Sequence, residues 1–168
     1  MIEMVVAKLA VDASTRNYVV ILQEKDGERV LPIWIGQPEA ESIIVEMHQI
    51  AHPRPLTHDL CRSLIQTLGA ELERIDITRI EERTYFAELH LRRDGERLTI
   101  DARPSDSIAV ALRLHAPIFA AESLLAEGGD DWDGGEPTGG PESPDLSAEK
   151  LKAYLERLRP EDFGKFNP

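Results

Sequence analysis

The chain has 168 residues, of which 42% are hydrophobic, and this suits one globular domain with a core of its own. Its single cysteine, Cys61, excludes an intramolecular disulfide and a cysteine-rich zinc site. The formal net charge is −12, and half of it falls on residues 127–168. This acidity excludes capture of nucleic acid by an overall positive field, so a polyanionic ligand needs a local arginine cluster or a bridging cation.

The first third of the chain predicts strands and then a helix. Runs rich in Val and Ile predict strands, and the turn signal at residues 25–28 joins the last two in a hairpin; the runs are residues 4–11, 18–22 and 29–35. Gly36 breaks the pattern, and Pro38 suits the first position of a helix. The apolar face of this helix is predicted from residues at helical spacing, which are Ile43, Ile44, Met47 and Ile50.

The middle of the chain continues with a helix, strands and a further helix. Thr57 begins a helix that ends at Gly69, and its predicted buried stripe comprises Leu60, Leu64, Ile65 and Leu68. Strands follow at residues 71–80, 84–91, 98–101 and 117–119, with a helix from about Ser105 before the last of them. Hairpins around about three helices predict an α+β domain with a mainly antiparallel or mixed sheet.

The last part of the chain differs in composition. Residues 127–147 are rich in Gly, Pro and acidic side chains and predict a flexible linker. Ser147 can cap a short amphipathic helix whose apolar stripe is Leu151, Tyr154, Leu155 and Leu158. Because so short a helix is marginal alone, we expect it to dock on its own domain or on a neighbour. The expected organisation is therefore a domain at 1–126, a linker at 127–147, and a helix and tail at 148–168.

The chain shows no signal for membrane insertion. Its first residues lack the basic start and apolar run of a signal peptide, and no apolar stretch approaches the roughly 18–20 residues that span a bilayer. We expect a cytoplasmic protein. Because a small domain with a long front hairpin needs its sheet edges covered, we also expect a homo-oligomer, a dimer rather than a trimer.

Two short runs carry the residues most suited to chemistry: Arg54-Pro55-Leu56-Thr57-His58-Asp59 and Arg103-Pro104-Ser105-Asp106. Each places an Arg-Pro pair before a hydroxyl residue suited to capping a helix and an aspartate in the first helical turn. A helix start beside an arginine can bind an anion through backbone N–H groups and the guanidinium. We therefore expect the two runs to be halves of one site.

Phosphodiester hydrolysis calls for an activated water, charge neutralisation and help for the leaving oxygen. The predicted catalytic residues are His58, Asp59, Asp101 and Asp106, and the predicted phosphate ligands are Arg54, Thr57, Arg103 and Ser105. Carboxylates that share a site favour Mg²⁺ or Mn²⁺. The candidate metal ligands are Asp59, Asp101, Asp106 and Glu39.

The same residues also allow a structural interpretation. The aspartates can complement helix dipoles, and the arginines can tie the two helix starts together in a buried Arg–Asp network. The other histidines share no ligand spacing and are interpreted as ordinary surface or loop residues; they are His48, His52, His90 and His115. Trp34 lies in a strand pattern and is interpreted as a core or interface residue.

Four motifs in one order resemble the bifunctional nuclease domain family. They are Leu31-Pro32-Ile33-Trp34-Ile35-Gly36 with Glu39-Ala40, the run at 54–60, the run at 101–107, and Ala116-Pro117-Ile118-Phe119. The resemblance covers residues 1–126, and residues 159–163 are similar to an extension of some bacterial members. It implies a small domain that degrades both RNA and DNA.

The resemblance and the candidate residues favour a nuclease of low sequence specificity, assisted by a metal or by arginines. The alternative is a non-enzymatic oligomeric module that binds a small anion or a partner protein. One observation separates them: whether Arg54, Asp59, Asp101, Arg103 and Asp106 line an open cleft or are paired with one another and closed to solvent.

Overall fold

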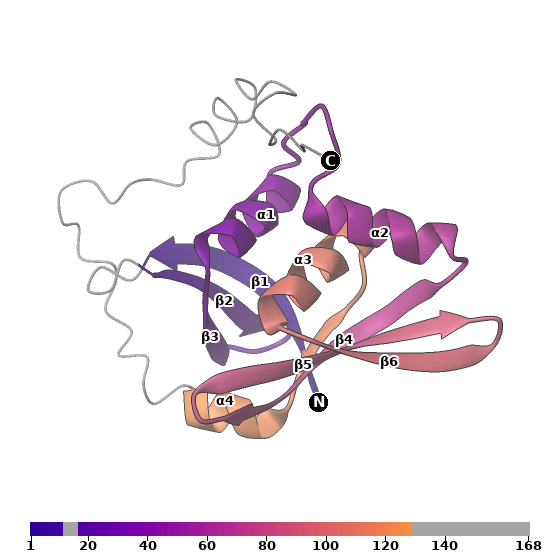
Figure 1. Cartoon of the computed structure of the whole chain (residues 1–168). Helices are drawn as coiled ribbons and strands as arrows, with labels where there is room; N and C mark the ends of the chain where they lie inside the picture. Colours follow the sequence, from indigo (N-terminus) through magenta and orange to yellow (C-terminus); the bar gives the residue numbers. More distant parts are fainter. Residues whose placement is uncertain (12–16, 129–168) are drawn as a thin grey trace.

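The computed structural model describes residues 1–11 and 17–128. Seven strands form one sheet in the order β3-β2-β1-β7-β4-β5-β6 (Figure 1). The strands are β1 (Ile2–Val11), β2 (Tyr18–Glu24), β3 (Val30–Ile35), β4 (Glu71–Glu81), β5 (Thr84–Arg93), β6 (Glu96–Ala102) and β7 (Ile118–Ala120). Neighbouring strands are antiparallel except β4 and β7, which are parallel. The predicted α+β class with a mixed sheet is confirmed.

Four helices accompany the sheet: α1 (Gln37–Met47), α2 (Thr57–Thr67), α3 (Pro104–Leu114) and α4 (Glu122–Gly128). The first three lie together on one side of the strands, and α3 contacts both α1 and α2 (Figure 1). The small side chains of Ala109 and Ala111 on α3 are fully buried, so neighbouring elements can approach it closely. Sequence patterns did not predict α4, which contacts β3 and β4.

The main core lies between the sheet and these helices. Large side chains without solvent exposure come from the strands and from α1 and α3; they include Leu22, Leu31, Ile43, Ile75, Ile77 and Ile108. Leu124 and Leu125 of α4 join the same cluster. A single continuous core explains why α3, which is buried along nearly its whole length, is held rigidly.

The predicted buried stripe of α2 is wrong for three of its four members. Leu60, Leu64 and Leu68 are 53%, 51% and 58% exposed, and only Ile65 packs against the core. The reason is that α2 turns a different face inward, which carries the buried polar residues His58 and Asp59. Polar contacts with α1 and α3, described below, decide the orientation of this helix.

None of the helices within residues 1–11 and 17–128 is long and apolar enough to cross a membrane. The predictions for the rest of the linker and for the C-terminal helix fall on residues 129–168, which lie outside the described residues.

Candidate functional site

The two Arg-Pro runs meet where α2 and α3 begin, beside the first turns of α1. Nε2 of His58 lies 3.0 Å from Oδ1 of Asp106. Both residues belong to the first helical turn, His58 on α2 and Asp106 on α3. Pro104 suits the start of α3, since it is the first residue of this helix and has no N–H that a helix start would leave unpaired. Residues separated by 48 positions are thereby brought into one cluster.

Asp106 forms a two-bond pair with Arg103. Nε of Arg103 donates to Oδ2 of Asp106 at 2.7 Å, and Nη2 donates to Oδ1 at 3.1 Å. The same Nη2 lies 2.8 Å from Oε1 of Glu39 on α1. Burial acts to raise the pKa of Asp106, but the hydrogen bonds from Arg103 and His58 outweigh it and lower the pKa. The pair is accessible, because the side chain of Arg103 is 66% exposed and that of Asp106 is 33% exposed.

His58 lies behind this pair and links it to α1. Its Nδ1 is 2.7 Å from Oγ of the buried Ser42. An ionised carboxylate only accepts hydrogen bonds, so Nε2 of His58 donates to Asp106. In the neutral ring Nδ1 then accepts from the Ser42 hydroxyl. The result is an aligned series of donors that runs from the interior at Ser42 to the partly exposed carboxylate of Asp106.

Asp59 belongs to a second network, which is closed to solvent. Nε of the fully buried Arg113 on α3 donates to its Oδ1 at 2.6 Å. Its Oδ2 lies 2.6 Å from Nε2 of His52 and accepts from the backbone N–H of Leu56 at 2.8 Å. Burial acts to raise the pKa of Asp59, but Arg113, the Leu56 N–H and His52 outweigh it and hold the pKa at about 2.

Arg113 makes two further bonds that tie the helices together. Nη1 donates to the carbonyl of Ala109, and Nη2 donates to the carbonyl of Ser42 at 3.2 Å. Ser42 therefore contributes its hydroxyl to the Asp106 series and its carbonyl to the Asp59 network. Ser42 thus links α1 to both α2 and α3, and the ion pair of Glu39 with Arg103 adds a second link between α1 and α3.

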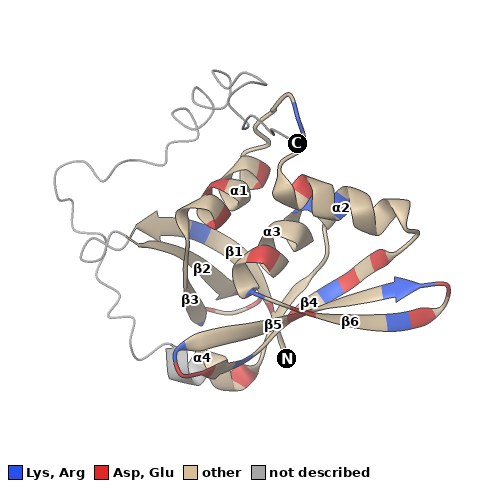
Figure 2. Ribbon diagram, viewed as in Figure 1, with Lys and Arg blue, Asp and Glu red and all other residues tan. Residues whose placement is uncertain are grey.

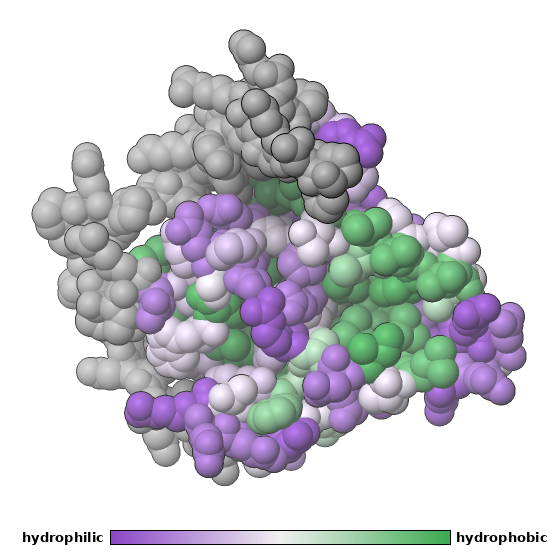
Figure 3. Space-filling model, viewed as in Figure 1, coloured by the Kyte–Doolittle hydropathy of each residue, from purple (hydrophilic) through white to green (hydrophobic). Residues whose placement is uncertain are grey.

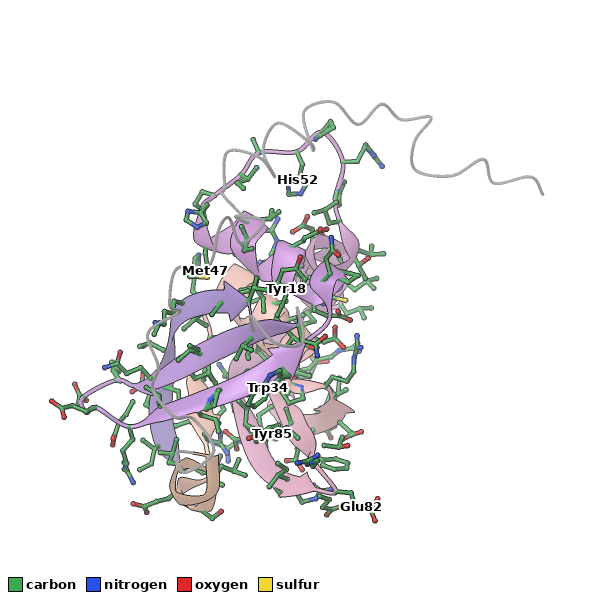
Figure 4. All side chains as sticks on the ribbon, turned by 90° about the vertical axis from the view of Figure 1, so that its left-hand side faces the viewer. Tyr18, Trp34, Met47, His52, Glu82 and Tyr85 are labelled. Carbon is green, nitrogen blue, oxygen red and sulfur yellow. The ribbon has the colours of Figure 1, made fainter. Side chains whose placement is uncertain are left out.

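A pocket of about 260 Å³ opens at the start of α3. It is lined by the end of β3 (33–36), the β4–β5 turn with the start of β5 (83–85), and the start of α3 (103–105). Arg83 is exposed and forms no ion pair with another described residue. Figure 4 shows Trp34 and Tyr85 near one another on this side of the molecule, and Trp34 is 44% exposed. Two arginines and two aromatic rings thus surround one pocket.

Ser105 is the buried polar residue of this pocket. The residue is 7% exposed, and its hydroxyl makes no hydrogen bond to another described residue. It occupies the second position of α3, whose start has no side-chain cap. The hydroxyl and the first-turn N–H groups of α3 are therefore available to an anion in the pocket.

Not every predicted site residue joins the cluster. Asp101 pairs with Glu88 across β5 and β6, and the alternation of side chains along β6 places it on the opposite face of the sheet from the core-facing Ala102. Arg54 is exposed in the loop before α2 and forms no ion pair with another described residue. The test that separates the two functional hypotheses, an open cleft or a closed network, therefore gives a mixed result. Arg103 and Asp106 lie beside the pocket, Asp59 is buried in a closed network, and Asp101 lies on the other face of the sheet.

The prediction that hydroxyl residues cap the two helices is wrong. The N-cap residues are Leu56 and Arg103, and neither start has a side-chain cap hydrogen bond. Thr57 is the first residue of α2 and is exposed. At the start of α2, the backbone N–H of Leu56 donates to the carboxylate of Asp59, the third residue of the helix. The predicted first-turn aspartates are confirmed in both helices.

The predicted carboxylate ligands do not assemble into a metal site in the described part of the chain. Across residues 1–11 and 17–128, no group of three or more His, Cys, Asp or Glu side chains could hold a metal ion. Both oxygens of Asp59 and of Asp106 already accept hydrogen bonds, and Glu39 faces Arg103. Arg113 and Arg103 supply the positive charge beside these carboxylates.

Sequence patterns missed three residues of the two networks: Ser42, His52 and Arg113. Arg113 had a signal, since it lies among the buried apolar residues of α3, where an arginine needs a partner. His52 differs from the expected ordinary loop histidine because it contacts buried Asp59. His90 differs likewise, with its Nε2 2.8 Å from Oδ2 of the buried Asp76. Ser42 carried no pattern of its own.

Comparison with known proteins identifies the family of this chain. The family model described as bifunctional nuclease domain matches residues 20–132. The chain belongs to the bifunctional nuclease domain family. The match contains β3, the starts of α1, α2 and α3, and every residue of the two networks. The resemblance predicted from the four motifs is thereby confirmed.

Individual relatives of this bifunctional nuclease domain protein fall into two groups. An uncharacterized protein of Mycobacterium tuberculosis is 40% identical over 165 residues, which is 96% of this chain and 97% of the relative. Bifunctional nuclease 2 of Oryza sativa subsp. japonica is 30% identical over 114 residues, 66% of this chain and 35% of the relative. Bifunctional nuclease 2 of Arabidopsis thaliana is 28% identical with the same coverage. The plant proteins are thus about three times as long as the part they share.

Proposed function

We propose that this protein is a nuclease of low sequence specificity that hydrolyses phosphodiester bonds of RNA and DNA at the pocket where α3 begins. The observation that carries the proposal is the accessible Arg103–Asp106 pair, supported from behind by His58 and placed beside a pocket with two arginines. Membership of the bifunctional nuclease domain family supports the same activity.

The pocket offers local binding for a phosphate. Arg103 and Arg83 supply guanidinium groups, and Ser105 and the first-turn N–H groups of α3 supply hydrogen-bond donors. Local donors are necessary because basic and acidic residues are interspersed over the molecule (Figure 2) and the net charge is −12. The exposed ring of Trp34 offers a stacking surface for an unpaired base next to that phosphate.

Asp106 is the group positioned to act on the attacking water. Its pKa is lowered by its hydrogen bonds with Arg103, so in the free protein it is a weak base. A phosphate that draws Arg103 away from Asp106 removes that stabilisation and makes the carboxylate more basic. Water then adds to phosphorus as its proton passes to Asp106, and the bond to the leaving oxygen breaks while Arg103 neutralises the developing charge. His58 holds Asp106 in place by donating to Oδ1.

Cleavage of single-stranded RNA and DNA by matched variants tests the proposal. Arg103→Ala and Asp106→Asn should each lower the cleavage rate by at least about 100-fold, the scale of losing one charge-stabilising group or proton acceptor. Arg93→Ala is the control, because this arginine is exposed at the end of β5, away from the pocket. Equal rates in the wild type and both site variants would refute the assignment.

The same assay in Mg²⁺, Mn²⁺ or EDTA compares metal assistance with arginine assistance. Binding of a short oligonucleotide without cleavage would favour the alternative, an anion-binding module. The structural observation that supports this alternative is that the Asp59–Arg113 network is closed to solvent. Cytoplasmic location and a homo-oligomer, a dimer rather than a trimer, stay predictions, and light scattering of the purified chain measures the second.

A further inference from the structure

A large apolar surface on the domain is left uncovered by the described residues. On α2 it consists of Leu60, Leu64 and Leu68, which recur every four residues and are each more than half exposed. Because residues four apart lie on one side of a helix, the three side chains form a single stripe. The stripe is not needed to hold α2 in place, since the opposite side of the helix carries the polar contacts with α1 and α3.

The surface continues onto the sheet. Leu98 and Ile100 of β6 are 45% and 50% exposed. Their cross-strand partners Leu91 and Leu89 on β5 are buried in the core, so the pairs point to the helix side of the sheet. β6 is an edge strand, and the helix layer ends before it. Figure 3 shows the result as a broad green area over α2 and the strands beneath it.

We propose that residues 147–158 of the same chain dock on this apolar face as a helix. Its members are Leu60, Leu64, Leu68, Leu98 and Ile100. The segment carries the complementary pattern, an apolar stripe of Leu151, Tyr154, Leu155 and Leu158. An amphipathic helix packed on an apolar surface is a common mode of recognition. It would extend the layer of α1, α3 and α2 over β6, the edge strand beside β5.

The dimensions of the two partners agree. From Leu151 to Leu158 a helix rises about 10 Å, and from Leu60 to Leu68 about 12 Å. The apolar stripe of the segment therefore matches the length of the stripe on α2. The segment buries little on its own, and docking would supply the tertiary packing that a helix this short needs.

The chain is long enough for the segment to reach its own domain. The described part ends with α4 at Gly128, and residues 129–150 separate it from Leu151. Fully extended, residues 129–150 span about 70 Å. A folded domain the size of residues 1–128 has a radius of gyration of about 14 Å. A tether of this kind keeps the segment at a high effective concentration, which favours it over a second copy of the protein. The bacterial relative aligned over 165 residues includes this segment, whereas the plant relatives align over 114.

Amide hydrogen exchange of the full-length protein tests the docking. In the wild type, amides of residues 147–158 should be protected. Leu155→Asp should speed exchange at least tenfold in that segment and should also speed it in β6 and the second half of α2. Leu64→Asp, at a half-exposed site outside the core clusters, should release the segment in the same way. Lys152→Asp is the matched control, since Lys152 lies off the apolar stripe, and it should change nothing.

Each other outcome overturns the proposal. Unprotected amides at 147–158 in the wild type would show that the segment does not dock. Unchanged exchange in α2 and β6 of Leu155→Asp would show that it docks elsewhere. Light scattering identifies a competing occupant: a dimer that Leu64→Asp dissociates and that persists after removal of residues 147–168 would assign the apolar face to a second copy. Protection that disappears on dilution would likewise exclude docking within one chain.

Discussion

The buried ion pair of Asp59 and Arg113 should make the free energy of unfolding depend on pH. A pKa of about 2 for Asp59 in the folded protein, in place of 3.8, corresponds to about 2 kcal/mol of stability at neutral pH. Because the pKa is lowered by folding, this contribution is complete above the unfolded pKa and is lost as the pH falls from about 4 to about 2. Asp59→Asn should therefore cost at least about 2 kcal/mol at pH 7, because it also leaves the buried Arg113 guanidinium without its carboxylate partner.

Arg113→Met should be more harmful than Asp59→Asn. It leaves an ionised carboxylate buried with fewer partners and also removes the bonds to the carbonyls of Ala109 and Ser42. Loss of one member of a buried ion pair costs about 3–5 kcal/mol. Because protonation of Asp59 relieves the unpaired charge, the deficit of Arg113→Met should shrink at low pH.

Urea unfolding between pH 7 and pH 2.5 measures both effects. The difference between the wild type and Asp59→Asn should narrow steadily below pH 4. Asp94→Asn is the control, since Asp94 is exposed in a turn with positive φ, which asparagine tolerates, and its effect should stay within about 0.5 kcal/mol. A difference that is independent of pH, or a cost below about 1 kcal/mol for Arg113→Met, would contradict the reasoning.

Two further predictions concern single positions. Gly69 follows α2 with φ +72°, and no atom lies within 4 Å of the place that a Cβ would take. Gly69→Ala should therefore lower the stability by about 1–2 kcal/mol through backbone conformation alone. Thermal unfolding measures this loss, and an unchanged midpoint would contradict the prediction. Asp101→Asn should keep the cleavage rate of the wild type, because Asp101 lies on the face of the sheet away from the Arg103–Asp106 pair; a loss as large as that of Asp106→Asn would return Asp101 to the site.

Local patterns predicted most of the fold. The strand runs, the turn at 25–28, and the helices after Gly36 and near Thr57 and Ser105 all correspond to elements of the structure. These features depend on neighbours in the sequence, such as Pro38 and Pro104 in the first turns of α1 and α3. The inward face of α2 depends instead on His58 and Asp59 meeting α3. No periodicity within α2 contains that information.

Local sequence patterns predicted only part of the candidate site, because several of its contacts join residues that are far apart in the sequence. His58 and Asp106 were expected together because each opens a helix, and the structure places them 3.0 Å apart. Asp101 was grouped with them because it ends the strand before the helix that Asp106 begins, but one step along a strand reverses the direction of a side chain. Arg113 and Ser42 act at distances of 54 and 71 positions from their partners, and such pairings follow only from the packing of three helices.

Pro32 of β3 has a consequence for how the protein behaves at high concentration. β3 forms one edge of the sheet, and Pro32 pairs with Ile21 of β2 while its ring nitrogen has no hydrogen to offer outward. A strand from another molecule that approached this edge would meet a missing donor in the middle of the ladder. Open-ended growth of the sheet from β3 is thereby disfavoured, which leaves β6 as the edge at which another strand could pair.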